Sequence, residues 1–558
     1  MMDAAARAGL YGLMVRTMGP QIRGGEAAAL LRMGPAPLTA LDDGFDLLLA
    51  VDWQNLQRFA DEIPLRAASL MIGDSDAGEP PAVLRETGAR LVSLPLKQAA
   101  KETGGAWVNM IAFGIAGTLT GIAADVLEAA LRASWKRGAD ALETNLAALR
   151  RGVEFARALD GELPAPLAAS GSAPAGRWVL SGNEAAGWGA IRAGVRFVAA
   201  YPITPATEML EWMAPTLARV GGTLLQAEDE LASVNMIIGA SYGSVPSLTA
   251  TAGPGLALMA EGIGLAVAAE VPIVVVDVMR GGPSTGIPAK SEQSDLSFAV
   301  DGLHGDAPRL VLAPTSIGDC MTTTAWAVQL AEALQSPAIV LSDQFMGQSR
   351  AVIDRPAQSP ALAQRMTAQA GETEYRRYLD VPSGISPMAV PGTPGTVYTA
   401  DGLEHNERGI PSSQAEDHRR QLAKRERKLA QYDYGPRWAD VEGDGELAVI
   451  TFGSTSGAVR EAIARCALRG LSLRLIAIRL LAPLQPAVLA QALDGVRQVM
   501  VVEQNYGGQL LRYLRGRFDL PGRPAGLHRP GPLPLRPGEL SEAFADWAAA
   551  QGVKETDR

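Results

Sequence analysis

The chain has 558 residues, 47% of them apolar and 20% charged, so several globular domains are expected rather than one core. The net charge of -10 argues against a nucleic-acid partner, because phosphate binding needs clustered Lys and Arg. Two cysteines exclude a disulfide framework, and with four scattered histidines they predict no metal or iron–sulfur site held by this chain alone.

The sequence also predicts a cytoplasmic protein with no membrane partner. A membrane-spanning helix needs roughly 18 or more apolar residues in a row. The best candidate, residues 253–278, is interrupted by Glu261, Glu270 and Asp277. The first residues, Met-Met-Asp-Ala-Ala-Ala-Arg, lack the basic-then-apolar order of a signal peptide.

Along the chain, apolar strand-like runs alternate with helical patterns in three successive blocks. This alternation is typical of parallel α/β domains. We therefore predict an α/β protein with three parallel-sheet domains. The predicted domains are residues 1–160, 178–350 and 441–558. A linker rich in Pro, Ala, Ser and Gly at 161–177 joins the first two, and an extension at 351–440 joins the second and third.

In the first block, residues 3–9 predict a helix, and later Ala-rich segments predict further helices. Strands are expected at 45–51, 67–72 and 90–94. In the second block the predicted strands are 196–201, 224–226, 247–252, 273–279, 310–313 and 339–342, with helices between them such as 231–242 and 256–270. Because the first of these helices carries no charge, we expect it to be largely buried.

The extension and the third block are less regular at their start. The extension is polar and punctuated by Pro and Gly, and its basic helix around 419–428 is expected to present a solvated face. The third block begins with a predicted strand at 447–452 and ends in a predicted helix at 541–551.

Four segments of the second block combine a strand end with residues that can carry chemistry. After the strand ending at Tyr201, two prolines stiffen a turn that contains Thr204. Ligands bind at the carboxyl ends of strands in open α/β sheets, so the Thr204 hydroxyl is a candidate. The alternative is a rigid turn in which Thr caps a helix.

The next two segments are acidic and glycine-rich. Glu228, Asp229 and Glu230 lie in the first turn of a helix, where the helix dipole also favours acids without any catalytic role. Gly253 and Gly255 form a strand-to-helix turn that lets backbone approach a ligand, although many α/β turns look alike.

The fourth segment is Met279-Arg280-Gly281-Gly282-Pro283-Ser284-Thr285-Gly286, after an apolar strand. An Arg beside glycines at a strand end suits bidentate capture of a carboxylate. It could equally pair with an acid of a nearby helix.

Taken in order, these segments resemble one family. Residues 181–350 resemble the pyrimidine-binding domain of the 2-oxoacid:ferredoxin oxidoreductases. The matching motifs are Gly182-Asn183-Glu184-Ala185, Tyr-Pro-Ile-Thr-Pro, Glu-Asp-Glu, Ala-Gly-Pro-Gly, Arg-Gly-Gly-Pro-Ser-Thr-Gly and Leu341-Ser342-Asp343-Gln344.

The flanking blocks are similar to the same family. The segments 451–457 and Val502-Glu503-Gln504-Asn505-Tyr506-Gly507-Gly508-Gln509 resemble its transketolase-C-like domain. Residues 1–160 resemble the gamma domain that many members fuse to the alpha chain, with Ile22-Arg23-Gly24-Gly25-Glu26 as the best-matching motif.

The resemblance implies an alpha subunit with a fused gamma domain that decarboxylates a 2-oxoacid oxidatively with CoA and thiamine diphosphate, giving acyl-CoA and reduced ferredoxin. It implies that Glu230 hydrogen-bonds the cofactor's aminopyrimidine ring, Thr204 contacts substrate and Arg280 holds a substrate carboxylate. Tyr201 and Thr285 are further candidates for substrate, as Gly253 and Gly255 are for the cofactor.

Three departures from the family pattern qualify this expectation. Gly443-Asp444-Gly445 mimics a magnesium–diphosphate motif, but no Asn-Asn follows and it precedes a strand, so it is predicted to be a turn. The diphosphate, Mg²⁺ and a [4Fe–4S] cluster are then expected in a beta subunit. Ala289 stands where relatives often carry Thr near the substrate. Finally, a helix at 3–9 stands where gamma domains begin with a strand, which suggests that translation starts upstream of Met1 or that this strand has been lost.

Other functions stay open from the sequence. The segments 383–387 and 402–405 resemble members that act on 2-oxoglutarate, although pyruvate, branched-chain and aryl 2-oxoacids remain alternatives. A non-catalytic nucleotide- or CoA-binding α/β protein and a transketolase-type enzyme are the alternatives from other classes.

Overall fold

The computed structural model describes residues 1–19, 27–58, 60–159, 167, 176–371 and 374–553. The motif at 22–26 and most of the predicted linker lie outside these residues. The chain divides into two compact units. The first comprises 1–180, 349–356 and 536–539, and the second 181–348, 357–535 and 540–558.

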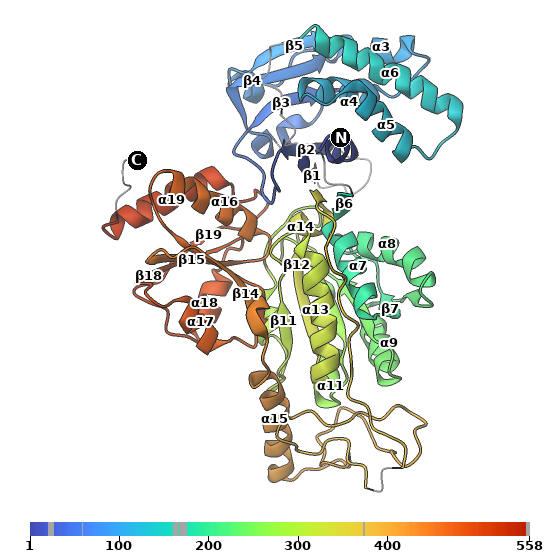
Figure 1. Cartoon of the computed structure of the whole chain (residues 1–558), viewed down its shortest axis with the longest axis vertical. Helices are drawn as coiled ribbons and strands as arrows, with labels where there is room; N and C mark the ends of the chain where they lie inside the picture. The colour runs from blue at the N-terminus through green and yellow to red at the C-terminus, as the bar shows by residue number, and fades with distance from the viewer. Residues whose placement is uncertain (20–26, 59, 160–166, 168–175, 372–373, 554–558) are drawn as a thin grey trace. The chain divides into compact units, whose positions relative to one another are not determined.

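The first unit contains the three strands that the sequence predicts. β3 (Phe45–Ala50), β4 (Leu65–Asp74) and β5 (Arg90–Leu94) form a parallel sheet. Its apolar side chains pack with α3 (Leu96–Glu102), α4 (Val108–Leu119) and α6 (Ala139–Arg157), which Figure 1 shows beside it. α5 (Ala124–Ser134) packs instead with α1 (Met2–Arg7), α4 and α6.

A second sheet of this unit was not predicted. After α1 (Met2–Arg7), the helix expected near the start, β1 (Tyr11–Met18) and β2 (Ala27–Gly34) form an antiparallel pair. The sheet runs β2-β1-β13-β6, with β6 at Trp178–Ser181 and β13 at Arg350–Ile353. β1 therefore finds a partner strand more than three hundred residues away, which no local pattern indicates.

The second unit is built on a seven-stranded sheet of order β17-β11-β12-β10-β9-β7-β8. All pairs are parallel except β11 with β17. The strands are β7 (Phe197–Ala200), β8 (Thr223–Gln226), β9 (Ser247–Thr251), β10 (Val274–Met279), β11 (Leu310–Leu312), β12 (Ala338–Asp343) and β17 (Leu480–Ala482). The prediction of strands in this block is confirmed to within one or two residues, because most of them are buried parallel strands, which are continuous apolar runs, although the edge strand β8 is largely exposed.

Helices connect these strands. α7 (Gly182–Ala193) begins with a capping box between Ser181 and Glu184 and packs on α13 (Asp319–Leu334). The others are α8 (Thr207–Ala218), α9 (Glu230–Tyr242), α10 (Gly253–Leu258), α11 (Ala260–Ala268), α12 (Leu296–Asp301) and α14 (Gln344–Gln348). The helix expected at 256–270 is thus two helices. The expectation that α9 is largely buried is half wrong, since Leu231 and Met236 are exposed.

The remaining sheet of the second unit has the order β14-β16-β15-β18-β19, with only β14 antiparallel. Its strands are β14 (Ala439–Glu442), β15 (Leu447–Phe452), β16 (Arg474–Ile478), β18 (Gln498–Glu503) and β19 (Ala525–His528). The helices are α16 (Thr455–Leu468), α17 (Pro486–Ala492), α18 (Gln509–Arg515) and α19 (Pro537–Ala550). Residues 443–445 form the predicted turn between β14 and β15.

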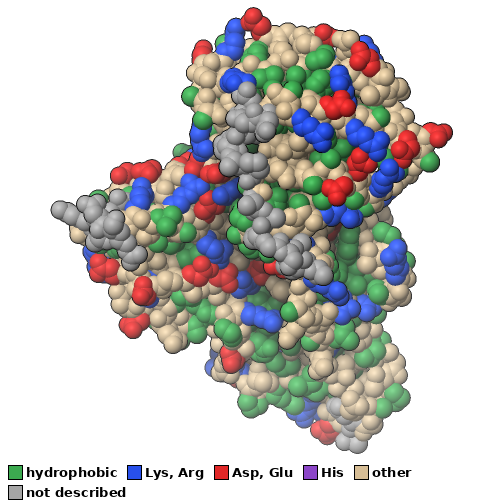
Figure 2. Space-filling model, turned by 45° about the horizontal axis from the view of Figure 1, so that its top comes forward, with side chains coloured by type: hydrophobic (Ala, Val, Ile, Leu, Met, Phe, Trp, Pro, Cys, Tyr) green, Lys and Arg blue, Asp and Glu red, His purple; other side chains and the backbone are tan. Residues whose placement is uncertain are grey.

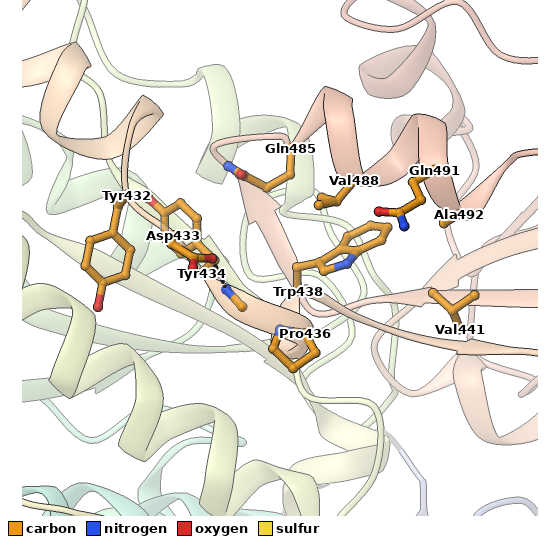
Figure 3. A pocket seen from close by; sticks show the side chains of 11 residues that line it. Tyr432, Asp433, Tyr434, Pro436, Trp438, Val441, Gln485, Val488, Gln491 and Ala492 are labelled. Carbon is orange, nitrogen blue, oxygen red and sulfur yellow. Dashed lines mark hydrogen bonds between the residues drawn. The ribbon is translucent and has the colours of Figure 1, made fainter.

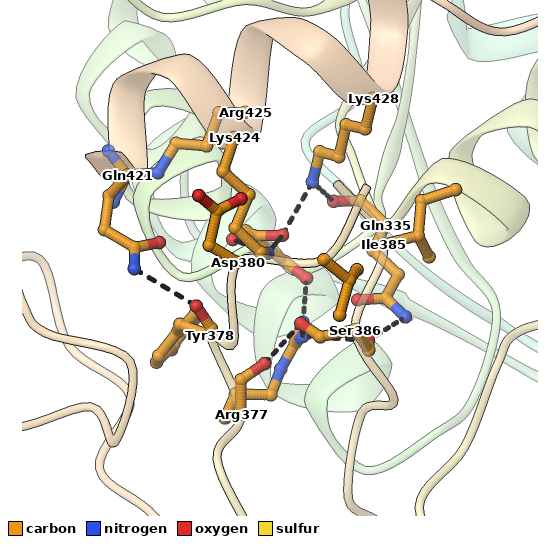
Figure 4. A network of polar contacts seen from close by, with 12 residues as sticks. Gln335, Arg377, Tyr378, Asp380, Ile385, Ser386, Gln421, Lys424, Arg425 and Lys428 are labelled. Carbon is orange, nitrogen blue, oxygen red and sulfur yellow. Dashed lines mark hydrogen bonds and ion pairs between the residues drawn. The ribbon is translucent and has the colours of Figure 1, made fainter. Parts of the chain in front are cut away.

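The basic helix of the extension presents the predicted solvated face at Arg419 and Glu426, but the prediction is wrong for its two lysines. In α15 (Ala415–Ala430), Lys424 and Lys428 are buried with their amines 2.7–2.9 Å from the Glu270 carboxylate. Figure 4 shows Lys424 and Lys428 pointing into a polar network that includes Arg377, whose guanidinium donates to the Glu270 carbonyl. Glu270, the acid that neutralises the two lysines, lies more than 150 residues earlier in the sequence, so the run of basic residues alone did not indicate their burial.

The surface shows no strong charge pattern on the side drawn in Figure 2, where Lys and Arg are interspersed with Asp and Glu. Among the described residues, no helix has the length and apolar character that crossing a membrane requires.

Candidate functional site

The predicted site residues follow four neighbouring strands of the seven-stranded sheet. β8, β7, β9 and β10 lie side by side and run parallel. Their carboxyl ends therefore meet at one edge, where ligands bind in open α/β sheets. Glu230 follows β8, Thr204 follows β7, the glycine pair follows β9 and Arg280 follows β10. The fold thus brings together segments that are separated in sequence.

The three acidic residues after β8 have different environments. Glu228 is exposed. The side chain of Asp229 caps α9 by accepting a hydrogen bond from the Ala232 amide at 2.7 Å. Glu230 is the first residue of the helix and is only 7% exposed. The helix-capping alternative therefore applies to Asp229, and Glu230 is left as the buried acid.

The Glu230 carboxylate lies against the turn after β9. A Cβ built on Gly255 would stand 2.7 Å from Glu230 Oε1 and 2.0 Å from Thr251 Oγ1, so no larger residue fits here. Among the described residues, no hydrogen bond engages this carboxylate. An almost buried carboxylate whose acceptor positions are free is suited to bind a donor group of a ligand.

Arg280 and Thr204 are brought into direct contact. The Arg280 guanidinium, on a residue only 6% exposed, donates from Nη1 to the backbone carbonyl of Thr204. The Asn183 amide donates to the carbonyl of Pro205 at 2.9 Å. The side chain of Ser294 donates to the carbonyl of Arg280 at 2.8 Å. The turn after β7 and the end of β10 are thus tied together, and a guanidinium is held at the sheet edge.

Two carboxyl groups beside Arg280 were missed as site residues. Asp277 on β10 is fully buried, and within the described part of the chain the group that faces its carboxylate is the carboxyl of Asp295 rather than an N–H or hydroxyl donor. Asp295 lies so close to Gly253 that a Cβ there would stand 2.6 Å from its Oδ1. The signal in the sequence was an acid inside the valine run of β10.

Burial raises the pKa of both acids. The pKa of Asp277 lies well above its usual range because of burial and of the neighbouring Asp295. Burial likewise raises the pKa of Asp295 to about 6, although the Ser294 hydroxyl and the charge of Arg280 oppose the shift. The pair therefore retains a proton at a pH where exposed carboxyls have lost theirs.

The structure does not bring the remaining two candidates into this buried cluster. Tyr201 is 40% exposed directly after β7. Thr285 is exposed in a turn closed by the bridge between Gly281 and Ile287. Ala289, at the position that departs from the family pattern, is buried.

A separate pocket of about 430 Å³ lies elsewhere in the second unit. Figure 3 shows Trp438 facing Val488 and Gln491, with Tyr432 at the other side of the pocket. None of the predicted site residues lines it.

Comparisons with known proteins assign the family. Residues 1–155 match the family described as pyruvate ferredoxin/flavodoxin oxidoreductase. Residues 188–424 match the family described as the thiamine-diphosphate-binding part of pyruvate flavodoxin/ferredoxin oxidoreductase.

Individual relatives agree with this assignment. The alpha subunit of 2-oxoacid:ferredoxin oxidoreductase 2 from Aeropyrum pernix is 32% identical over 78% of this chain and 72% of its own. The 2-oxoglutarate synthase subunit KorA of Methanothermobacter marburgensis is 35% identical over 63% of this chain and 96% of its own.

A solved structure is similar over almost the whole chain. It is the 2-oxoglutarate:ferredoxin oxidoreductase of Magnetococcus marinus, with 2-oxoglutarate, coenzyme A and succinyl-CoA bound. It is 36% identical, has a TM-score of 0.89 and covers 98% of this chain and 95% of its own. The resemblance found in the sequence is thereby confirmed, and the chain belongs to the family of 2-oxoacid:ferredoxin oxidoreductase alpha subunits.

Proposed function

We propose that this chain is the catalytic alpha subunit, with a fused gamma domain, of a 2-oxoglutarate:ferredoxin oxidoreductase that forms succinyl-CoA, CO₂ and reduced ferredoxin. The observation that carries this proposal is the meeting of Glu230, Thr204 and Arg280 at adjacent strand ends. The substrate is inferred from the relatives named for 2-oxoglutarate.

Thiamine diphosphate fits the residues after β8 and β9. The backbone of Gly255 packs directly against Glu230 and Thr251, which holds the Glu230 carboxylate in place while leaving it free to accept a hydrogen bond. We place the pyrimidine ring of the cofactor at this position, with Glu230 accepting a proton or hydrogen bond from a ring nitrogen. When bound, the cofactor supplies the electron sink for decarboxylation.

The protein's own groups would orient the substrate. Arg280 offers a planar fork of donors that matches a carboxylate, and its contact with the Thr204 carbonyl fixes where that fork lies. The Thr204 hydroxyl lies on the same turn. These groups bind and align the 2-oxoacid and exclude water; they take no part in electron transfer.

A beta subunit is required by this proposal to supply the diphosphate site, Mg²⁺ and a [4Fe–4S] cluster. The turn at 443–445 supports this division, because it precedes a strand and is not followed by the rest of a magnesium motif. The exposed apolar side chains Leu231, Met236 and Leu258, on helices α9 and α10 that carry the site, suit an interface with that subunit. We place the complex in the cytoplasm, with ferredoxin as electron acceptor.

The proposal is tested by co-expressing the chain with its beta subunit and following CoA-dependent reduction of a viologen dye. 2-Oxoglutarate, pyruvate and a branched-chain 2-oxoacid would be compared, with a reaction lacking CoA as control. Reduction with 2-oxoglutarate alone is the expected result. Preference for another 2-oxoacid would correct the substrate. A stable complex loaded with cofactor and cluster that reduces nothing would contradict the proposed function.

A further inference from the structure

The side chain of Gln509, in the transketolase-C-like part of the chain, holds a loop of the pyrimidine-binding part. Its Nε2 donates to the carbonyl of Ser294 at 2.8 Å, and its Oε1 accepts from the amide of Ser297 at 2.8 Å. One amide group thus pairs with both a carbonyl and an N–H of the same loop. Such a two-point contact fixes orientation as well as distance.

Gln509 is itself held firmly. Its backbone amide donates to Asn505 Oδ1 at 3.2 Å, and Asn505 Nδ2 donates to the buried carboxylate of Glu503 at 2.6 Å. Glu503 also accepts from the amides of Leu510 and Leu511 at 2.7 and 3.0 Å. The segment 503–509, which the sequence singles out, therefore forms a rigid base for one glutamine.

A second glutamine ties the same loop to the same base. Gln293 is 1% exposed, and its backbone N–H donates to the backbone carbonyl of Gln504 at 2.8 Å. The backbone N–H of Gln504 donates back to the side-chain oxygen Oε1 of Gln293 at 2.8 Å. The side-chain Nε2 of Gln293 donates to the backbone carbonyl of Phe452 at 2.7 Å. The loop is anchored at positions 293, 294 and 297 from one side.

The anchored loop in turn holds the end of β10. Ser294 donates from Oγ to the carbonyl of Arg280 at 2.8 Å, and the amide of Gly281 donates to the carbonyl of Lys290 at 3.1 Å. Arg280 then donates to the carbonyl of Thr204. A continuous series of hydrogen bonds thus leads from Gln509 through Ser294 and Arg280 to Thr204.

We infer that Gln509 is a positioning residue for the substrate arginine, acting through the backbone of Ser294. The inference rests on the proposed function of Arg280. It gives the Glu-Gln-Asn-Tyr-Gly-Gly-Gln segment a role in substrate affinity, although no atom of that segment need touch the substrate. The sheet that contains β18 thereby fixes the position of the Arg280 guanidinium at the end of β10 in the seven-stranded sheet.

The test uses the assembled alpha–beta complex with Gln509→Ala, and Gln491→Ala, an exposed glutamine of the same sheet region, as matched control. Loss of two hydrogen bonds should raise the KM for the 2-oxoacid by about tenfold, with the KM for CoA and kcat nearly unchanged. The control should match the wild type. An unchanged KM for the 2-oxoacid in the Gln509 variant would overturn the inference.

A double-mutant cycle separates positioning from a general loss of structure. Arg280→Lys should raise the same KM, and adding Gln509→Ala should raise it little further, because both changes affect one group. Additive effects would contradict action through Arg280. If Gln509→Ala does not assemble, Ser294→Ala cuts the same link and should reproduce the rise in KM. A wild-type complex without 2-oxoacid turnover would instead count against the proposed function.

Discussion

At the scale of single residues, position rather than composition distinguishes one acid from its neighbours. Glu228, Asp229 and Glu230 stand in sequence, yet one is exposed, one caps a helix and one is buried against a glycine turn. Only the third has a shielded carboxylate, packed against the backbone of Gly255. The place of the Glu230 carboxylate therefore depends on Gly255, because a Cβ at 255 would clash with Glu230 and Thr251.

Replacing Glu230 with Gln should lower kcat of the assembled complex by about 10²- to 10⁴-fold, because the amide cannot take up the proton that acid–base catalysis moves. Assembly, followed by size-exclusion chromatography, should be unchanged. Glu228→Gln is the matched control and should keep wild-type turnover. Substantial activity of the Glu230 variant would show that another group activates the cofactor.

Asp277 should make stability fall as the pH rises. Its pKa is raised in the folded state, so the folded chain keeps a proton that the unfolded chain releases near pH 4. Stability then decreases from about pH 4 up to the folded pKa. Asp277→Asn removes this loss, and its midpoint of thermal unfolding should exceed the wild type at pH 8.

The midpoints of thermal unfolding of Asp277→Asn and of the wild type would be compared at several pH values from 5 to 8. The gain should shrink toward pH 5, where the wild-type acid is also protonated. Exposed Asp306→Asn should follow the wild-type curve. A gain independent of pH would mean that packing, and not ionisation, accounts for the effect.

At the scale of elements, α15 shows how a helix made mostly of charged and polar residues becomes part of a core. Its Lys424 and Lys428 amines share the Glu270 carboxylate, and Lys428 also donates to the carbonyl of Gln335 at 2.7 Å. Burial alone would raise the pKa of Glu270, but Lys424, Lys428 and Arg377 lower it overall. Burial lowers the pKa of Lys428 to about 7, below its ordinary value.

Replacing Glu270 with Gln should destabilise the second unit by about 3–5 kcal/mol, because it leaves buried ammonium groups without a counter-charge. Glu426→Gln, on the exposed face of α15, should have little effect. The free energy change would be taken from urea unfolding at pH 7. An effect below about 1 kcal/mol would mean that the lysines lose their protons at little cost.

At the scale of the whole molecule, the sequence predicts the middle of the chain best. Buried parallel strands such as β10 are short apolar runs between turns, so their positions and the residues that follow them can be read locally. The same reading marks the turns that contain Thr204, Arg280 and the three acids 228–230 as candidates, and the family resemblance then singles out Glu230 among the acids. The turns are candidates because ligand sites of open sheets lie at strand ends.

The features that escaped prediction depend on distant partners. β1 pairs with β13, the buried face of α15 depends on Glu270, 154 residues before Lys424, and Gln509 holds a loop more than two hundred residues earlier. Asp277 and Asp295 become a pair only when β10 and the loop before α12 fold together. None of these contacts has a periodic or compositional signature in one sequence.

The antiparallel pairing of β17 with β11 has a consequence for how such a chain can be divided. β17 belongs by sequence to the C-terminal block, yet it covers the outer edge of the seven-stranded sheet. Cutting or splitting the gene near residue 440 would uncover the apolar edge Leu310–Leu312, and exposed strand edges recruit other chains into aggregates. We therefore expect the second and third blocks of the chain to stay together when such a gene is split or recombined, even though they contain two sheets.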